Sequence, residues 1–238
     1  DRPVITPDDG NEPEKPDVTE TKTGTLAFED IWPGGGDYDM NDVIVEYNRA
    51  VSFDKKNQVT KIVDTFTPVH DGAVFANAFA YQVDKGQFGK MTFSATTEGI
   101  HTESATSSII VCPNVKQAIQ KVYTITREFT GGSFNKKDLK SYNPYIIVKY
   151  AEGQKGRTEV HLPKHEATSL ADLSLAGTQK DAYYIDKEGA YPFAIDIPIL
   201  NFISVTEKKS IDTEYPNFKA WADSKGEKYT DWYNNHVN

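Results

Sequence analysis

Side chains that carry oxygen are concentrated in one stretch near the start of the chain. Six of them fall within fourteen residues: Glu29, Asp30, Asp37, Asp39, Asn41 and Asp42. Three glycines precede the densest part, and the residues at 37, 39 and 41 then follow at every second position. A tight loop with this spacing can direct several oxygens to one point, and calcium takes about six to eight oxygen ligands. The stretch therefore predicts a calcium site that ties the loop of residues 37–42 to Glu29 and Asp30.

The same residues are also compatible with a purely structural turn. Asp and Asn side chains often accept hydrogen bonds from backbone amides in turns. The match to an EF-hand loop is incomplete, because Asp42 stands where that loop needs glycine and Asn48 where it needs a bidentate glutamate. A calcium site here is then a loop that leads into a strand, and a capped turn without metal is the alternative.

The rest of the sequence offers little that resembles catalysis. His161 and His165 are separated by Pro163, which excludes a regular helix that would bring them together, so structural or exposed roles are expected for both. No nucleophile elbow, phosphate-binding loop or reactive Cys–His pair occurs. The 35 acidic residues allow many carboxylate pairs, but no spacing singles out one for glycoside hydrolysis. We therefore predict a protein that is not an enzyme, with a hydrolase as the minor alternative.

The composition of the chain limits which classes of partner it can bind. The 238 residues carry a net charge of −9, which disfavours nucleic acid because phosphate binding needs clustered Lys and Arg. The single cysteine, Cys112, excludes an internal disulfide and is expected to be buried. No apolar run is long enough for a transmembrane helix. Since the chain starts at Asp1 without Met, we expect a trimmed mature fragment whose export signal or lipid anchor has been removed.

Alternating apolar residues and turn signals predict mostly β-structure. The expected strands cover residues 25–28, 43–53, 58–67, 73–83, 107–112, 121–129, 144–150, 159–162 and 194–199. Polar turns at 54–57 and 153–156 predict two hairpins, and a helix is expected at 215–222, with Pro216 at its first position and Gly226 after its end. This order predicts an all-β fold, an antiparallel β-sandwich of jelly-roll type with a short C-terminal helix.

The first 22 residues differ from the rest of the chain. They contain four prolines, many acids and almost no apolar residues, so they cannot bury enough surface to offset the entropy of ordering. We predict a disordered linker at 1–22 and a single β-sandwich domain at 23–238.

Aromatic residues in or near loops suggest a second kind of binding site, because ring faces can stack on sugars. The candidates are Tyr142, Tyr145, Tyr183, Tyr184, Trp232 and Tyr233. Trp221 is instead expected to pack the terminal helix onto the sheet. A carbohydrate-binding module that uses these loop aromatics is the alternative function.

Several motifs, in this order, resemble the LruC domain family. They are GTLAFEDIWP at 24–33, GDYDMNDVIVEY at 36–47, VHLP at 160–163, YPFAIDIP at 191–198, EKKSI at 207–211, YPNFKAWADS at 215–224 and DWY at 231–233. Phe193 stands where the family has Trp. The resemblance implies a domain of exported bacterial proteins, often surface lipoproteins of Gram-negative bacteria, with no catalytic activity attached. We expect a calcium-stabilised, cell-surface or secreted module for adhesion or for binding an extracellular glycan or surface protein.

Overall fold

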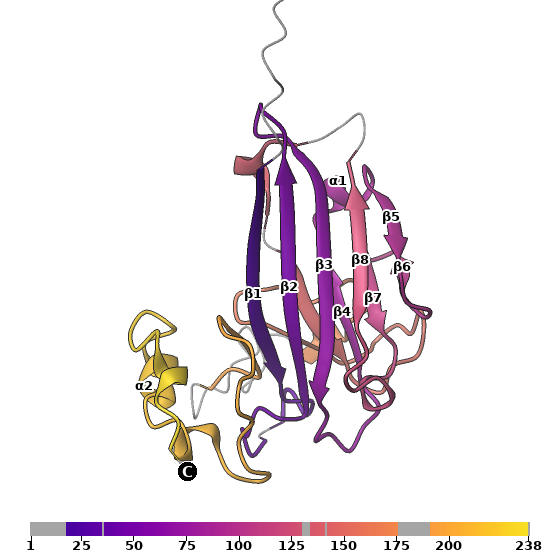
Figure 1. The fold of residues 1–238 in the computed structure, drawn as a ribbon. Helices are drawn as coiled ribbons and strands as arrows, with labels where there is room; N and C mark the ends of the chain where they lie inside the picture. The colour runs from indigo at the N-terminus through magenta and orange to yellow at the C-terminus, as the bar shows by residue number, and fades with distance from the viewer. Residues whose placement is uncertain (1–17, 35, 130–133, 141, 176–190, 238) are drawn as a thin grey trace, which may run out of the picture.

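The computed structural model describes residues 18–34, 36–129, 134–140, 142–175 and 191–237. Two antiparallel sheets lie face to face (Figure 1), which confirms the predicted β-sandwich. The first sheet has the order β11-β1-β2-β3-β8-β5, with β1 at Val18–Phe28, β2 at Val43–Phe53, β3 at Val59–His70, β5 at Thr92–Ala95, β8 at Tyr123–Glu128 and β11 at Ala194–Ile197. The second has the order β10-β9-β4-β7-β6, with β4 at Ala78–Gln82, β6 at His101–Glu103, β7 at Ser108–Cys112, β9 at Asn143–Ile147 and β10 at Glu159–His161.

The core between the sheets follows from the period-two alternation of the strands. Leu26 of β1, Val45 of β2 and Phe66 of β3 are buried in the same cluster as Phe79 of β4 and Ile146 of β9. Phe66 and Phe79 meet edge to face with ring centroids 5.0 Å apart. The three long strands of the first sheet thus supply one wall of the core, and the shorter strands of the second sheet supply the other.

The C-terminal part of the chain covers the opposite side of the first sheet. Ala27 and Ile44 belong to a second buried cluster, which also contains Tyr215, Phe218 and Trp232. Figure 1 shows this yellow segment beside β1.

The helices are α1 at Lys85–Phe88, α2 at Phe218–Asp223, and single 3-10 turns at Val115–Gln117, Lys136–Asp138, Leu173–Leu175, Ile211–Thr213 and Trp232–Asn234. The predicted C-terminal helix is confirmed, but it begins at Phe218, so the placement of Pro216 at its first position is wrong.

The expected boundaries hold for some elements and not for others. The strand at 43–53 has the predicted limits. The linker boundary at 22 is wrong, since β1 begins at Val18 and residues 18–22 pair with β2. Residues 1–17 lie outside the described part of the chain. The strand expected from 73 starts only at Ala78, because Gly72 and Ala73 donate their amides to the acidic loop instead.

Two other sequence expectations concern burial and membranes. Cys112 is buried as predicted and forms no disulfide. No helix in the described residues is long and apolar enough to cross a membrane.

Candidate metal site

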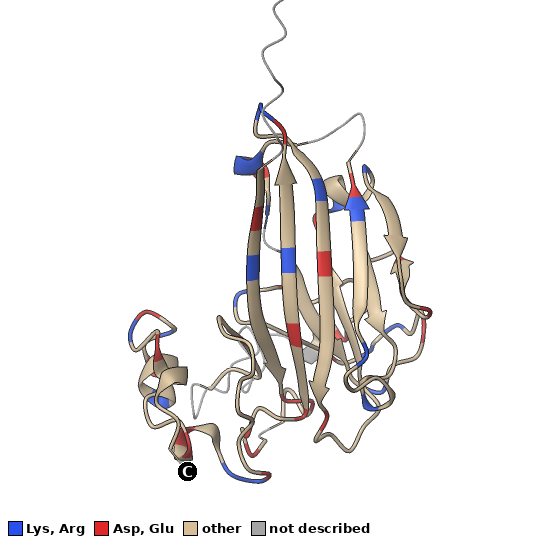
Figure 2. Cartoon of the chain, viewed as in Figure 1, with Lys and Arg blue, Asp and Glu red and all other residues tan. Residues whose placement is uncertain are grey.

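The acidic loop lies between the end of β1 and the start of β2 (Figure 2). Its residues alternate between anchors and oxygen-bearing side chains. Tyr38 and Met40 both have φ near 55°, which is uncommon for residues other than glycine. Met40 is fully buried, and the Tyr38 ring lies 5.5 Å from the rings of Tyr191 and Phe193. The apolar residues hold the loop to the core, and the acidic residues between them face the end of β1.

Three of the predicted ligands form one group. Single carboxylate oxygens of Glu29, Asp37 and Asp39 all lie within 4.8 Å of one another. Glu29 and Asp39 are 1% and 2% exposed, and Asp37 is on the surface. A Cβ at Gly36 would lie 2.6 Å from Oε2 of Glu29, so a larger residue there would force this carboxylate to shift. The geometry gives an oxygen cluster that is open on one side, a suitable arrangement for a hard cation.

Backbone amides fix two of these carboxylates. Oε1 of Glu29 accepts a hydrogen bond of 2.5 Å from the Met40 amide. Oδ1 of Asp39 accepts from the Asn41 amide at 3.3 Å, and Oδ2 accepts from the Lys208 amide at 2.9 Å. Asp39 thus accepts hydrogen bonds from backbone amides and also belongs to the carboxylate cluster.

Asp30 and Asp42 lie in a neighbouring pair. Oδ2 of Asp42 accepts from the Asp30 amide at 2.8 Å, and Oδ2 of Asp30 accepts from the amide group of Asn77 at 2.7 Å. The Asp71 carboxylate acts on Asp30 electrostatically and pairs with Lys116 at 3.0 Å. Asp71 and Asn77 were not predicted from the sequence, because Asp71 falls between two expected strands and Asn77 lies within one of them.

Burial makes this group of acids electrostatically unfavourable. Burial, with repulsion from Asp42, Asp39 and Asp37, raises the pKa of Glu29 well above its ordinary value. Burial also raises the pKa of Asp39, and that of Asp30 despite the hydrogen bond from Asn77. Burial and repulsion from neighbouring carboxylates raise the pKa of Asp42 to about 7. A bound cation would remove the repulsion that causes part of these shifts.

Asn41 joins the loop to the C-terminal part of the chain. Its Nδ2 donates to the Val205 carbonyl at 3.3 Å, and its Oδ1 faces Gly72, where a Cβ would lie only 2.5 Å away. The Ile211 amide donates to the Tyr38 carbonyl at 2.8 Å. Of the six predicted ligands, Asn41 is therefore a structural link, and the loop is the point where residues 205–211 attach to the sandwich.

The aromatic and histidine candidates are mostly interior. Tyr145 is fully buried and Trp232 is 2% exposed, so neither offers a ring face to a sugar. Tyr183 and Tyr184 lie outside the described residues. Trp221 is half-buried against the C-terminal cluster, and its ring contacts are with Phe218 and Trp232.

His161 has the structural role expected for it. Its ring stacks on Tyr145 at 4.4 Å, and its Nε2 lies 2.9 Å from the Glu159 carboxylate. Glu159 and Arg157 are fully buried and form an ion pair of 2.6 Å. This network was not predicted from the sequence, because Arg157 directly follows a predicted turn.

Comparisons with known proteins add a family and a fold. A family model described as "Domain of unknown function (DUF4842)" matches residues 57–233. A solved structure, the crystal structure of a putative lipoprotein from Bacteroides ovatus, is similar with a TM-score of 0.66 and 17% identity. The similarity covers 99% of this chain and 79% of that one, and at this identity it supports the fold alone. No curated protein matches the sequence.

Proposed function

Since the chain belongs to the DUF4842 family of domains of unknown function, we propose that it is a non-enzymatic module outside the cell, stabilised by calcium. One observation supports the proposed metal site: the oxygens of Glu29, Asp37 and Asp39 lie within 4.8 Å of one another at a partly buried position. Calcium binds carboxylate and carbonyl oxygens in flexible geometry, whereas magnesium requires a nearly ideal octahedron. An irregular loop therefore suits calcium better than magnesium.

The ion has a structural role in this proposal. Neutralising the carboxylates removes their repulsion, and binding stabilises the folded state by mass action. Asp39 also accepts from the Lys208 amide, and Tyr38 from the Ile211 amide, so ordering the loop orders the attachment of the C-terminal segment. Calcium would thus fasten the cluster around Phe218 and Trp232 to the outer side of the sheet.

Export to the cell surface is supported by two similarities. The sequence resembles the LruC domain, and the solved structure with the same fold is described as a putative lipoprotein. A surface module of this kind would act in adhesion or in binding an extracellular ligand. Of the four described aromatic candidates, Tyr145 and Trp232 are buried and Tyr142 and Tyr233 are half-buried, which disfavours the carbohydrate-binding alternative.

Thermal unfolding in excess calcium, in magnesium and in chelator tests the metal. We expect a clear rise in melting temperature with calcium, a smaller rise with magnesium, and none with chelator. The matched variant is Glu29→Gln, which can still accept the Met40 amide through its carbonyl oxygen but loses the charge. An equal melting temperature of the wild-type chain in calcium and in chelator would exclude the proposal.

A further inference from the structure

Three buried carboxylate and amide oxygens have no hydrogen-bond donor among the described residues. They are Oδ2 of Asp71, Oδ1 of Asn77 and Oδ1 of Asn114. Asn77 is 0% exposed, and the side chain of Asp71 is 2% exposed. A buried acceptor without a donor costs free energy, more when it is charged, so this arrangement of oxygens needs a reason.

The three oxygens belong to one neighbourhood, at the end of the sandwich that carries the acidic loop. Nδ2 of Asn77 donates to Oδ2 of Asp30 at 2.7 Å, so the Oδ1 of the same amide group is held beside this carboxylate. The Asn77 carbonyl accepts from the amide of Val115, the residue after Asn114, at 2.9 Å. Asp71 acts on the Asp30 carboxylate electrostatically. The unpaired oxygens thus come from three segments that lie around Asp30.

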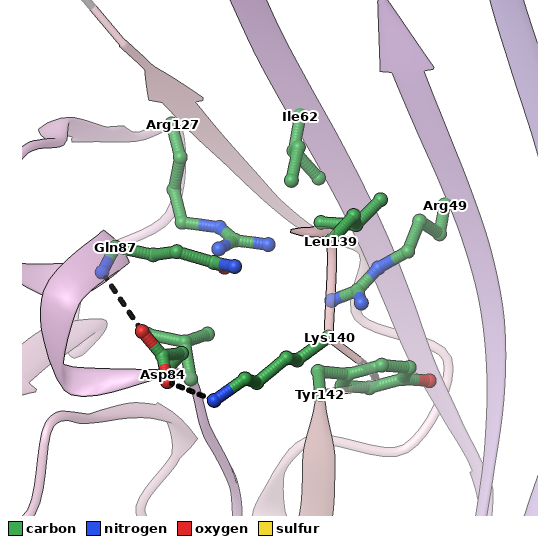
Figure 3. A pocket seen from close by; sticks show the side chains of 9 residues that line it. Arg49, Ile62, Asp84, Gln87, Arg127, Leu139, Lys140 and Tyr142 are labelled. Carbon is green, nitrogen blue, oxygen red and sulfur yellow. Dashed lines mark hydrogen bonds and ion pairs between the residues drawn. The ribbon is translucent and has the colours of Figure 1, made fainter. Parts of the chain in front are cut away.

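The buried arginine nitrogens without an acceptor belong to a different cluster, around Asp64. Nη2 of Arg49 and Nε of Arg127 have no acceptor among the described residues, and Figure 3 shows both guanidinium groups near the Tyr142 ring. This ring lies 3.5 Å from the Arg49 guanidinium, so the chain's own side chains fill the space. Unpaired donors and unpaired acceptors are therefore separated, and the group at Asp71 consists of oxygens.

The negative charge at the end of the sandwich exceeds what one calcium ion neutralises. Six carboxylates lie there, namely those of Glu29, Asp30, Asp37, Asp39, Asp42 and Asp71. Lys116 supplies one positive charge, since its Nζ lies 3.0 Å from Oδ1 of Asp71. One calcium ion at the acidic loop would leave three net negative charges, and a second divalent cation would reduce them to one.

We propose that Asp71, Asn77 and Asn114 bind a second calcium ion beside Asp30. Carboxylate and amide oxygens are ligands that calcium prefers, and water completes a shell of about six to eight oxygens. An ion at this position gives a partner to each unpaired oxygen. Lys116 pairs with Oδ1 of Asp71, and its side chain is 46% exposed, so it can turn into solvent when the ion binds.

The second site depends on the acidic loop, so this inference rests on the proposed function. The amides of Gly72 and Ala73, which follow Asp71, donate to the carbonyls of Asn41 and Asp42 at 3.1 and 3.3 Å. Calcium at the acidic loop would therefore order the segment that carries Asp71. The second ion then binds after the first.

The number of calcium ions bound at equilibrium tests the second site. After dialysis against calcium chloride at pH 7.5, metal analysis should find two ions per wild-type chain and one per chain of Asn114→Ala. Asn217→Ala is the matched control and should bind two, because both asparagines precede a helical turn without capping it through their side chains. One ion in the wild-type chain, or two in Asn114→Ala, would overturn the proposal.

Glu29→Gln separates this inference from the proposed function. It should bind no calcium, because the second ion needs an ordered acidic loop, and one ion in this variant would overturn that dependence. If the proposed function fails, the wild-type chain binds no calcium, or Glu29→Gln binds as much as wild type. If the second site alone fails, the wild-type chain binds a single ion and Glu29→Gln loses it.

Lys116→Gln tests the position of the second ion. Removal of a competing positive charge beside Asp71 should tighten binding of the second ion about two- to fivefold. The exposed Lys228→Gln should leave the affinity unchanged. Unchanged or weaker binding in Lys116→Gln would overturn the placement of the ion beside Asp71.

Discussion

Replacement of Asp42 by asparagine should stabilise the protein in the absence of calcium. Oδ2 of Asp42 accepts a hydrogen bond of 2.8 Å from the Asp30 amide, and an asparagine carbonyl can accept the same bond. Burial and the carboxylates of Asp30, Asp39 and Asp37 raise the pKa of Asp42 to about 7. Above that pH the folded chain carries a charge that is better solvated in the unfolded chain, and Asp42→Asn removes it.

The magnitude follows from the pKa. A rise from 3.8 to about 7 corresponds to about 4 kcal/mol of unfolding free energy at pH 8. Partial exposure and salt reduce this value, so we expect a gain of about 2–3 kcal/mol, or about 4–12 °C in melting temperature for a chain of this size. Because the folded-state pKa is raised, this contribution to wild-type stability is intact below about pH 4 and is lost as pH rises through 7.

The assay is thermal unfolding of wild type and Asp42→Asn in chelator at pH 4.5 and pH 8. The variant should be more stable at pH 8, and its gain at pH 4.5 should be about a quarter of the gain at pH 8. Asp231→Asn is the control, because Asp231 is exposed and its side chain caps no amide of its helical turn. A variant that is less stable than wild type at pH 8, or that gains equally at both pH values, would refute the reasoning.

Three further predictions concern other parts of the account. The calcium-induced rise in melting temperature should be larger at pH 8 than at pH 5, since protons compete for carboxylates whose pKa values are raised; a constant rise would contradict this. Calcium should slow hydrogen exchange of the Ile211 amide, which donates to the Tyr38 carbonyl in the acidic loop, and unchanged exchange would separate the loop from the C-terminal segment. Glu159→Gln should lower the unfolding free energy in urea by about 1–3 kcal/mol, because it removes one buried partner of Arg157 while the ion pair with Glu103 remains; an unchanged unfolding free energy would show that the pair is dispensable.

The strands predicted most accurately are those in which apolar and polar residues alternate along the strand itself. Val43 to Phe53 alternates over eleven residues, and the observed strand has the same limits. By contrast, residues 18–22 of β1 are exposed and polar, and only their pairing with β2 makes them a strand. The short edge strands at 92–95 and 101–103 were not predicted either, since their residues are largely exposed or half-buried.

The location of the candidate site was predicted, but the division of its acidic residues into two separate groups was not. Local spacing identified the acidic loop, and the structure groups Glu29 with Asp37 and Asp39. Local spacing could not show that Asn77, forty-seven residues from Asp30, donates to the pair formed by Asp30 and Asp42. That contact depends on the packing of the two sheets. The ion pair of 2.6 Å between Arg49 and Asp64 did leave a signal, since Arg49 occupies an inward position among the apolar residues of β2.

Calorimetric titration of calcium into the wild-type chain and into Glu29→Gln, both at pH 7.5, tests the central claim most directly. Glu29 is the buried member of the oxygen cluster that comes from the end of β1, and its replacement keeps the shape of the side chain. We predict saturable binding of calcium to the wild-type chain and its loss in Glu29→Gln, with the variant still folded. Absence of binding to wild type, or equal binding to both chains, would contradict a metal site at the acidic loop.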